Sequence, residues 1–121
     1  MGQHRVLVVD DEDMIRESLV EFLDESGYQA IGAIHGGDAL DKLKSLSPLP
    51  CVILLDLMMP IMSGADFYAE KQRDPSLASI PVVVVSADGH VRQKAVTVGG
   101  EYLAKPLRFE KVMGAVERHC S

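Results

Sequence analysis

The sequence predicts one doubly wound α/β domain, built on a five-stranded parallel sheet with the strand order 2-1-3-4-5. Three continuous apolar runs, at residues 6–9, 52–55 and 82–85, are typical of strands covered on both faces. Segments with helical periodicity separate the strands, and strict alternation implies right-handed crossovers and parallel pairing. At 121 residues the chain has the usual size of a single domain, so we expect residues 1–121 to form one.

The strand at residues 6–9 leads into the first predicted helix. Its apolar stripe has the spacing of one helix face: Ile15, Leu19, Phe22 and Leu23. Gly27 stands where a left-handed residue would end this helix. The second strand, expected at residues 30–34, has less side-chain bulk. The helix after it, which Pro48 stops, carries these apolar positions: Leu40, Leu43 and Leu46.

The last three strand and helix pairs follow the same alternation. After the third strand, residues 63–66 have capping-box spacing at the start of a helix, and Asp74–Pro75 ends it. A fourth helix, closed by Gly99–Gly100, is indicated by Val91, Ala95 and Val98. A weak fifth strand at residues 102–104 precedes a helix with a clear apolar stripe: Phe109, Val112, Met113 and Val116.

Charge and composition exclude several classes of protein. The net charge is −6, and ten of the acidic residues but only two basic ones lie within residues 1–41, which argues against nucleic-acid binding. No apolar run approaches the roughly 20 residues of a membrane span. Asp10 and Asp11 interrupt any secretory signal, so we expect a cytoplasmic protein whose Cys51 and Cys120 are reduced thiols. The four isolated histidines are interpreted as surface residues: His4, His35, His90 and His119.

Acidic residues follow the first and third strands. In a sheet of this order, ligands bind beyond the carboxyl ends of the strands, where the order reverses between those two strands. Asp10 and Asp11 follow the first strand and Asp56 follows the third, so three carboxylates should meet at one edge. A hard divalent cation such as Mg²⁺ would neutralise them. The alternative is that Asp11 and Asp13 only cap the first helix.

Two further strand ends add a hydroxyl and a cation to the same edge. Ser86 ends the fourth strand, and Lys105 follows the fifth. A carboxylate nucleophile, a metal, a hydroxyl and an ammonium are the groups that an in-line phosphoryl transfer requires. The pattern therefore predicts that Asp56 becomes a phosphoaspartate.

With these residues in place, residues 5–120 resemble the receiver domain of two-component response regulators, a flavodoxin-like (βα)5 fold. The matching motifs are Val6-Leu7-Val8-Val9-Asp10-Asp11-Glu12, Leu54-Leu55-Asp56-Leu57-Met58-Met59-Pro60, Ser63-Gly64, Ser86-Ala87 and Lys105-Pro106. The resemblance implies that Asp56 accepts a phosphoryl group from a histidine kinase or phosphotransfer protein. It also implies Mg²⁺ held by Asp10, Asp11, Asp56 and the Met58 backbone carbonyl, with Lys105 on a phosphoryl oxygen.

The resemblance implies a switch as well. Ser86 would move to the phosphoryl group and Tyr102 would turn inward, changing a partner-binding face formed by the fourth helix, the fifth strand and the fifth helix. The alternative is a Tyr102 that is simply half buried on an edge strand. The resemblance further implies a cis Lys105–Pro106 peptide and allows a homodimer on phosphorylation. Residues 99–102 are about one residue shorter than the family pattern, which could attenuate the switch.

Two other classes compete with this interpretation. A phosphatase of the haloacid dehalogenase class also uses an aspartate nucleophile with magnesium, but it needs a second aspartate where this chain has Met58. An interaction module that is never phosphorylated would not need the five site residues, which are all present: Asp10, Asp11, Asp56, Ser86 and Lys105. A P-loop nucleotide enzyme is excluded because its G-x-x-x-x-G-K-[ST] motif is missing.

Overall fold

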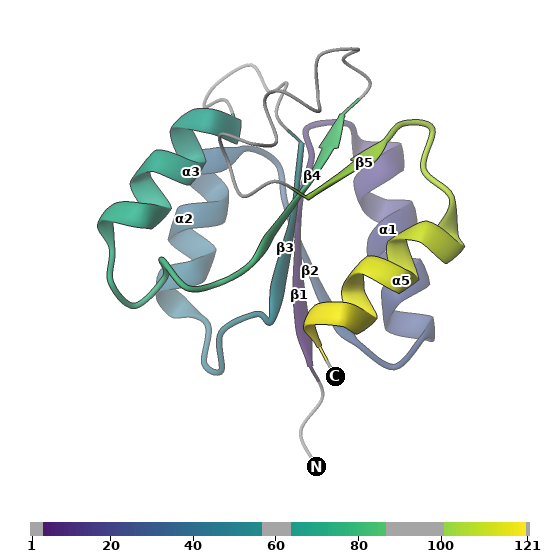
Figure 1. Cartoon of the computed structure of the whole chain (residues 1–121), viewed down its shortest axis with the longest axis horizontal. Helices are drawn as coiled ribbons and strands as arrows, with labels where there is room; N and C mark the ends of the chain where they lie inside the picture. Colours follow the sequence, from purple (N-terminus) through teal and green to yellow (C-terminus); the bar gives the residue numbers. More distant parts are fainter. Residues whose placement is uncertain (1–3, 57–63, 87–100, 121) are drawn as a thin grey trace.

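A computed structural model describes residues 4–56, 64–86 and 101–120 of the chain. It contains a five-stranded sheet in the order β2-β1-β3-β4-β5 with every pair parallel, which confirms the predicted architecture (Figure 1). The strands are β1 Arg5–Val9, β2 Gln29–Ala33, β3 Val52–Asp56, β4 Val82–Ser86 and β5 Tyr102–Ala104. The helices are α1 Asp13–Glu25, α2 Gly36–Ser45, α3 Gly64–Arg73 and α5 Phe109–His119. The helix predicted from Val91, Ala95 and Val98 lies outside the described residues.

The core lies on both faces of the sheet, because alternate residues of each apolar strand point to opposite sides. On the side of α2 and α3, the strands contribute Leu7, Val9, Ile53, Leu55, Val82 and Val84. On the side of α1 and α5, they contribute Val6, Val8, Val52, Leu54, Val83 and Val85. Figure 1 shows these two helix layers with the sheet between them. Continuous apolar runs are therefore required in the central strands, where neither face meets water.

The helix ends follow local chemistry. Gly27 has a φ of 95°, as expected for a left-handed residue after α1. The second helix ends before the last of its predicted leucines, since Leu46 is the extended C-cap residue. Leu43 is buried, as predicted, and so is Ala39. His35 is the N-cap of α2, and its Nδ1 accepts a hydrogen bond from the Asp38 backbone N–H at 3.1 Å. No helix within the described parts of the chain has the length and apolar character needed to cross a bilayer.

Lys71 is a buried cation on α3. Only 1% of its surface is exposed, and its Nζ donates to the Ala78 carbonyl at 2.9 Å and to Gln72 Oε1 at 2.8 Å. Burial lowers its pKa below the ordinary value of 10.5. The ammonium thus satisfies a carbonyl of the turn that connects α3 to β4.

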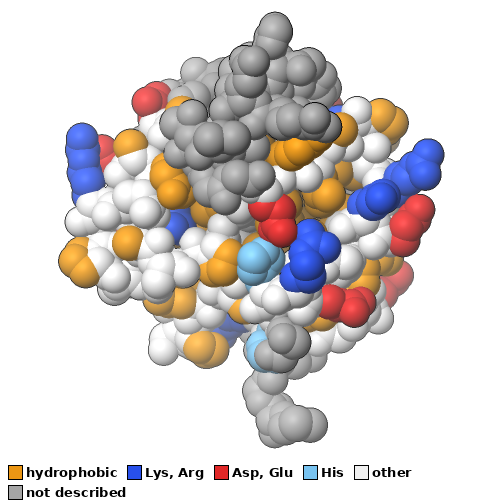
Figure 2. Space-filling model, in the orientation of Figure 1, with side chains coloured by type: hydrophobic (Ala, Val, Ile, Leu, Met, Phe, Trp, Pro, Cys, Tyr) orange, Lys and Arg blue, Asp and Glu red, His pale blue; other side chains and the backbone are white. Residues whose placement is uncertain are grey.

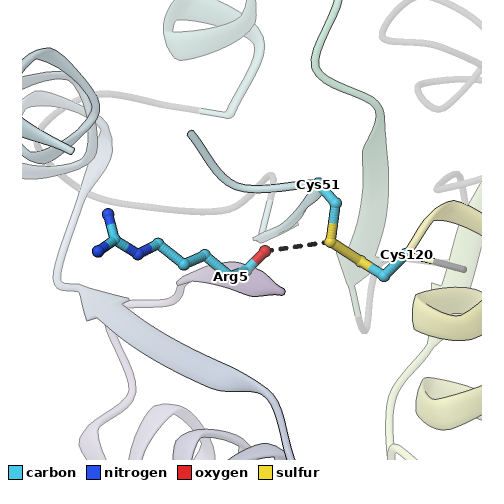
Figure 3. The surroundings of a disulfide bond; sticks show 3 residues. All are labelled: Arg5, Cys51 and Cys120. Atoms are coloured by element: carbon cyan, nitrogen blue, oxygen red, sulfur yellow. Dashed lines mark hydrogen bonds between the residues drawn. A yellow bond between two sulfur atoms is a disulfide. The ribbon is translucent and has the colours of Figure 1, made fainter. Parts of the chain in front are cut away.

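The two cysteines are joined, so the prediction of reduced thiols is wrong. Cys51 precedes β3, Cys120 follows α5, and the disulfide between them links Cα atoms 5.4 Å apart (Figure 3). The fold brings together two positions that lie 69 residues apart in sequence, which the expected compartment could not predict. The Lys105–Pro106 peptide is cis, as the resemblance implies.

Candidate functional site

Three carboxylates meet at the carboxyl end of the sheet. One oxygen from each of Asp10, Asp11 and Asp56 lies within 4.8 Å of the others, as the strand-end rule predicts. Asp10 and Asp56 are buried, whereas Asp11 is exposed. Asp10 directly follows β1 and Asp56 is the last residue of β3, so the strands hold these two acids, whereas Asp11 faces solvent.

Backbone and side-chain hydrogen bonds fix Asp10. Its N–H donates to the Ala33 carbonyl at 3.1 Å, and its Oδ1 accepts from the Glu12 N–H at 2.9 Å. Its carbonyl accepts from Arg16 at 3.0 Å. Arg16 can pass over β2 because Gly32 has no side chain, since a Cβ there would lie 3.1 Å from Arg16 Cδ. The orientation of Asp10 is therefore set before any ligand arrives.

Lys105 supplies the positive charge of the site. Its Nζ lies 3.1 Å from Asp10 Oδ2, 3.0 Å from Glu12 Oε1 and 3.5 Å from Asp56 Oδ2. Burial opposes its charge, but hydrogen bonds to Glu12 and Asp10 and the charges of Asp10 and Asp56 outweigh burial and raise the pKa of Lys105 above 10.5. Lys105 is therefore a permanent cation at physiological pH.

Glu12 is a member of the site that the sequence interpretation missed. It is the N-cap residue of α1, but its side chain makes no capping bond and extends to Lys105. The alternative interpretation, in which Asp11 and Asp13 only cap the first helix, is wrong for Asp11, which joins the carboxylate cluster. Asp13 does lie in the first turn of α1, where it pairs with Arg16. Nothing in the sequence around Glu12 indicates that its side chain would bind a lysine 93 residues away.

The remaining predicted residues are placed by strand register. Asp56 pairs with Val85 and Ser86 with Ala104, so the end of β4 lies between Asp56 and Lys105 along the same edge. Met58 and the side chain of Ser86 lie outside the described residues. Tyr102 begins β5, is partly buried and packs against the core on the α2 and α3 side.

The donor set suits a hard divalent cation. All three clustered groups are carboxylates, and Lys105 is the cation within 4 Å of Asp10 and Asp56 among the side chains that the structure describes. Asp10, Asp11, Asp56 and Glu12 together carry more negative charge than this lysine neutralises. Oxygen ligands with an excess of negative charge are the preference of Mg²⁺. The residues present therefore fit a magnesium site.

A second charged cluster holds the other end of α5. Glu101 lies 3.0 Å from Arg118 and 2.7 Å from His119, so His119, which was predicted to be a surface residue, is partly exposed and pairs with this acid. Partial burial disfavours the charge of Glu101, but hydrogen bonds from His119 and Arg118 and their charges outweigh it, so the pKa of Glu101 falls below 4.5.

We expect Glu101→Gln to lower the free energy of unfolding at pH 7 by about 0.5–1 kcal/mol, since the pairs are partly exposed. A carboxyl group whose pKa is lower in the folded than in the unfolded protein stabilises the fold at pH values above its unfolded pKa. This stabilisation is lost as the pH falls through its folded pKa. The difference in the free energy of unfolding between wild type and Glu101→Gln should therefore become smaller below about pH 4.5. Urea unfolding across this range measures it, with exposed Glu117→Gln on the same helix as the control; a difference independent of pH would contradict the ion pairs.

Comparison with known proteins places this geometry in context. Residues 6–117 match the family model described as the response regulator receiver domain. Protein PilG of Pseudomonas aeruginosa is 32% identical over 118 residues, which cover 95% of this chain and 86% of PilG. The phosphate regulon transcriptional regulatory protein PhoB of Escherichia coli is 32% identical over 93% of this chain, but this chain spans only half the length of PhoB.

Solved structures show the same fold. A response regulator receiver protein from Pseudomonas putida superimposes with a TM-score of 0.88 and 30% identity, covering 98% of both chains. TrrA of Thermotoga maritima, solved in complex with Mg²⁺-BeF, gives a TM-score of 0.81 and 31% identity over 96% of this chain and 98% of TrrA.

Proposed function

Since this chain belongs to the family of response regulator receiver domains, we propose that it is a phosphoacceptor switch in which Asp56 takes a phosphoryl group from a phosphohistidine. The observation that carries the proposal is the position of Asp56, buried at the end of β3 between an acid pair and Lys105. The protein would catalyse only its own phosphorylation and dephosphorylation.

The groups at the edge of the sheet have complementary roles in this transfer. A carboxylate oxygen of Asp56 attacks phosphorus while the P–N bond to the donor histidine breaks, and the released electron pair stays on the imidazole nitrogen. Lys105 would turn from the Asp56 carboxylate to an oxygen of the new acyl phosphate and neutralise part of its charge. Mg²⁺ held by Asp10, Asp11, Asp56 and the Met58 carbonyl would supply the remaining neutralisation.

Two residues would carry the signal away from Asp56. The Ser86 hydroxyl would bind another phosphoryl oxygen, and the ring of Tyr102 would move inward. The strand pairing supports a coupling between Ser86 and Tyr102. The partner of Tyr102 on β4 is Val84, which lies two residues before Ser86. The partner face would then comprise β5, α5 and the segment between β4 and β5.

We expect Tyr102→Ala to leave the rate of phosphorylation within about twofold of wild type, because Tyr102 lies outside the carboxylate cluster. Binding of the phosphorylated chain to its output partner should weaken at least tenfold, since the inward ring would be missing. Phosphorylation kinetics and a binding titration measure the two effects, with Tyr28→Ala as a control on the opposite face of the sheet. Equal partner affinity for wild type and Tyr102→Ala would contradict the switch.

The partners follow from the same proposal. The donor would be a histidine kinase or phosphotransfer protein, and the recipient of the signal an output domain or a separate output protein. A homodimer formed on phosphorylation and a cytoplasmic location stay predictions. Figure 2 shows basic and acidic side chains interspersed over the described part of one face, which gives no support to nucleic-acid binding by this domain on that face.

The decisive experiment uses a small acyl phosphate as donor. Wild-type protein incubated with it and Mg²⁺ should gain one phosphoryl group by intact mass, and the adduct should be lost in hydroxylamine, as expected for an acyl phosphate. Chelation of Mg²⁺ should prevent the gain. Steady release of phosphate from many phosphate monoesters would instead favour the phosphatase class. If no adduct forms and the acyl phosphate leaves partner binding unchanged, an interaction module is favoured.

A further inference from the structure

The pair Cys51 and Cys120 stands at the end of the sheet opposite the carboxylates. Cys51 precedes the first residue of β3, while Asp56 is its last. The Cα separation of 5.4 Å is within the ordinary range for disulfides. Backbone hydrogen bonds place both cysteines without help from the sulfur bond, because Cys51 N–H donates to the Arg5 carbonyl and Cys120 N–H to the Val116 carbonyl, each at 2.9 Å.

The sulfur of Cys51 has a bonding partner in either redox state, Cys120 in the disulfide and the Arg5 carbonyl oxygen as a thiol. Its Sγ lies 3.2 Å from the Arg5 carbonyl oxygen (Figure 3). In the disulfide this sulfur carries no proton, but as a thiol it would donate its proton to that oxygen. Reduction therefore leaves no buried polar atom without a partner at Cys51, and Cys120 as a thiol would remain in the apolar cluster of α1 and α5.

The end of α5 is held in three ways. The disulfide is one, the pairs of Glu101 with Arg118 and His119 are the second, and burial of Val112, Ala115 and Val116 is the third. Two of the three persist without the sulfur bond, so the reduced protein should stay folded with a looser last turn of α5.

We infer that Cys51 and Cys120 form a reversible thiol–disulfide exchange site that takes a dithiol reductant at Cys51 and controls how firmly the last turn of α5 is held. Cys51 is the partly exposed residue of the pair and Cys120 is buried, so a thiolate of the dithiol attacks Cys51 Sγ. The S–S bond breaks, and Cys120 leaves as a thiolate that takes up a proton. The second thiolate of the reductant then displaces Cys51, so the dithiol is oxidised by two electrons and two cysteine thiols form.

The exchange site and the proposed phosphorylation site are spatially separate. Exchange should therefore change α5 without changing the chemistry at Asp56. Any effect on an output partner rests on the proposed function, because α5 belongs to the proposed partner face. The redox chemistry itself does not depend on that proposal.

The test equilibrates the full chain in mixtures of oxidised and reduced dithiothreitol, then counts thiols by alkylation and mass spectrometry. We expect one transition from no free thiol to two. Amide hydrogen exchange in residues 116–119 should rise at least tenfold on reduction, and Tm should fall by roughly 10 °C. The double variant Cys51→Ser/Cys120→Ala should match the reduced protein in exchange and Tm and ignore the reductant; the serine preserves a donor to Arg5.

Two outcomes overturn the inference. One is that both thiols stay free in oxidised dithiothreitol; the other is that oxidised and reduced wild type have the same exchange in residues 116–119 and the same Tm. Asp56→Asn is measured in parallel and should show the wild-type redox transition. A normal transition with no phosphoryl adduct in wild type would remove the proposed function alone, whereas a normal adduct with no transition would remove this inference alone.

Discussion

Replacement of Asp56 by Asn abolishes the phosphoryl adduct, on our expectation, while the fold is kept. The amide oxygen of Asn is a poor nucleophile, so the attacking group of the proposed transfer is lost. The side chains have the same shape, and the backbone pairing of Asp56 with Val85 does not involve the carboxylate. Intact mass after incubation with Mg²⁺ and a small acyl phosphate measures the loss, and the far-ultraviolet spectrum reports the fold.

The matched control for this variant is Asp41→Asn on α2. Asp41 is exposed and lies outside the carboxylate cluster, so the same change of charge should leave phosphorylation at the wild-type level. If Asp56→Asn formed the adduct in full, the phosphoryl group would have to be attached to another residue. In that case the role of Asp56 as phosphoacceptor would have to be withdrawn.

Replacement of Lys105 by Met should have the second large effect, on both rate and stability. Without its ammonium, the developing charge on the phosphoryl group loses a positioned donor, so phosphorylation should slow by about two orders of magnitude. Asp10 and Asp56 are buried and would lose the cation that lies within 4 Å of both. Breaking such a pair typically costs about 3 kcal/mol in the free energy of unfolding.

The pH and metal dependence make this prediction specific. The pKa of Lys105 is raised above 10.5 in the folded protein. The stabilisation of the fold by the charged lysine is therefore fully present below pH 10.5 and is lost only as the pH rises through the folded pKa. The loss in Lys105→Met should thus be constant from pH 6 to 9. Mg²⁺ should recover part of it, since the ion neutralises the same carboxylates.

Urea unfolding with and without Mg²⁺, together with single-turnover phosphorylation, measures both effects of Lys105→Met. Lys111→Met on α5 is the control, because Lys111 is an exposed lysine outside the cluster. A variant as stable as wild type and insensitive to Mg²⁺ would show that Lys105 does not balance the buried acids.

Strand positions and the place of the site could be predicted because both depend on local signals. A strand covered on both faces must be apolar throughout, and β1, β3 and β4 are found where residues 6–9, 52–55 and 82–85 predict them. The parallel arrangement then sends every strand end to one edge. Asp10, Asp11 and Asp56 are adjacent because β1 and β3 are also neighbours in the sheet.

Contacts between distant side chains could not be predicted in the same way. The Glu12 side chain is free to cap its own helix, yet it extends to Lys105, and His119 pairs with Glu101. The disulfide is the clearest case, since the expected compartment pointed to free thiols while the packing of α5 on the sheet brings Cys51 and Cys120 together.

The sequence by itself determined the alternation of strands and helices and the charged residues that stand at the strand ends, because hydrophobic periodicity and chain connectivity act over short distances. Only the tertiary structure decided which charged and sulfur-bearing side chains meet across that framework. Those pairings depend on the register and docking of whole elements, where a shift of a few ångströms separates one partner from another, and no local pattern of residues encodes distances of that kind.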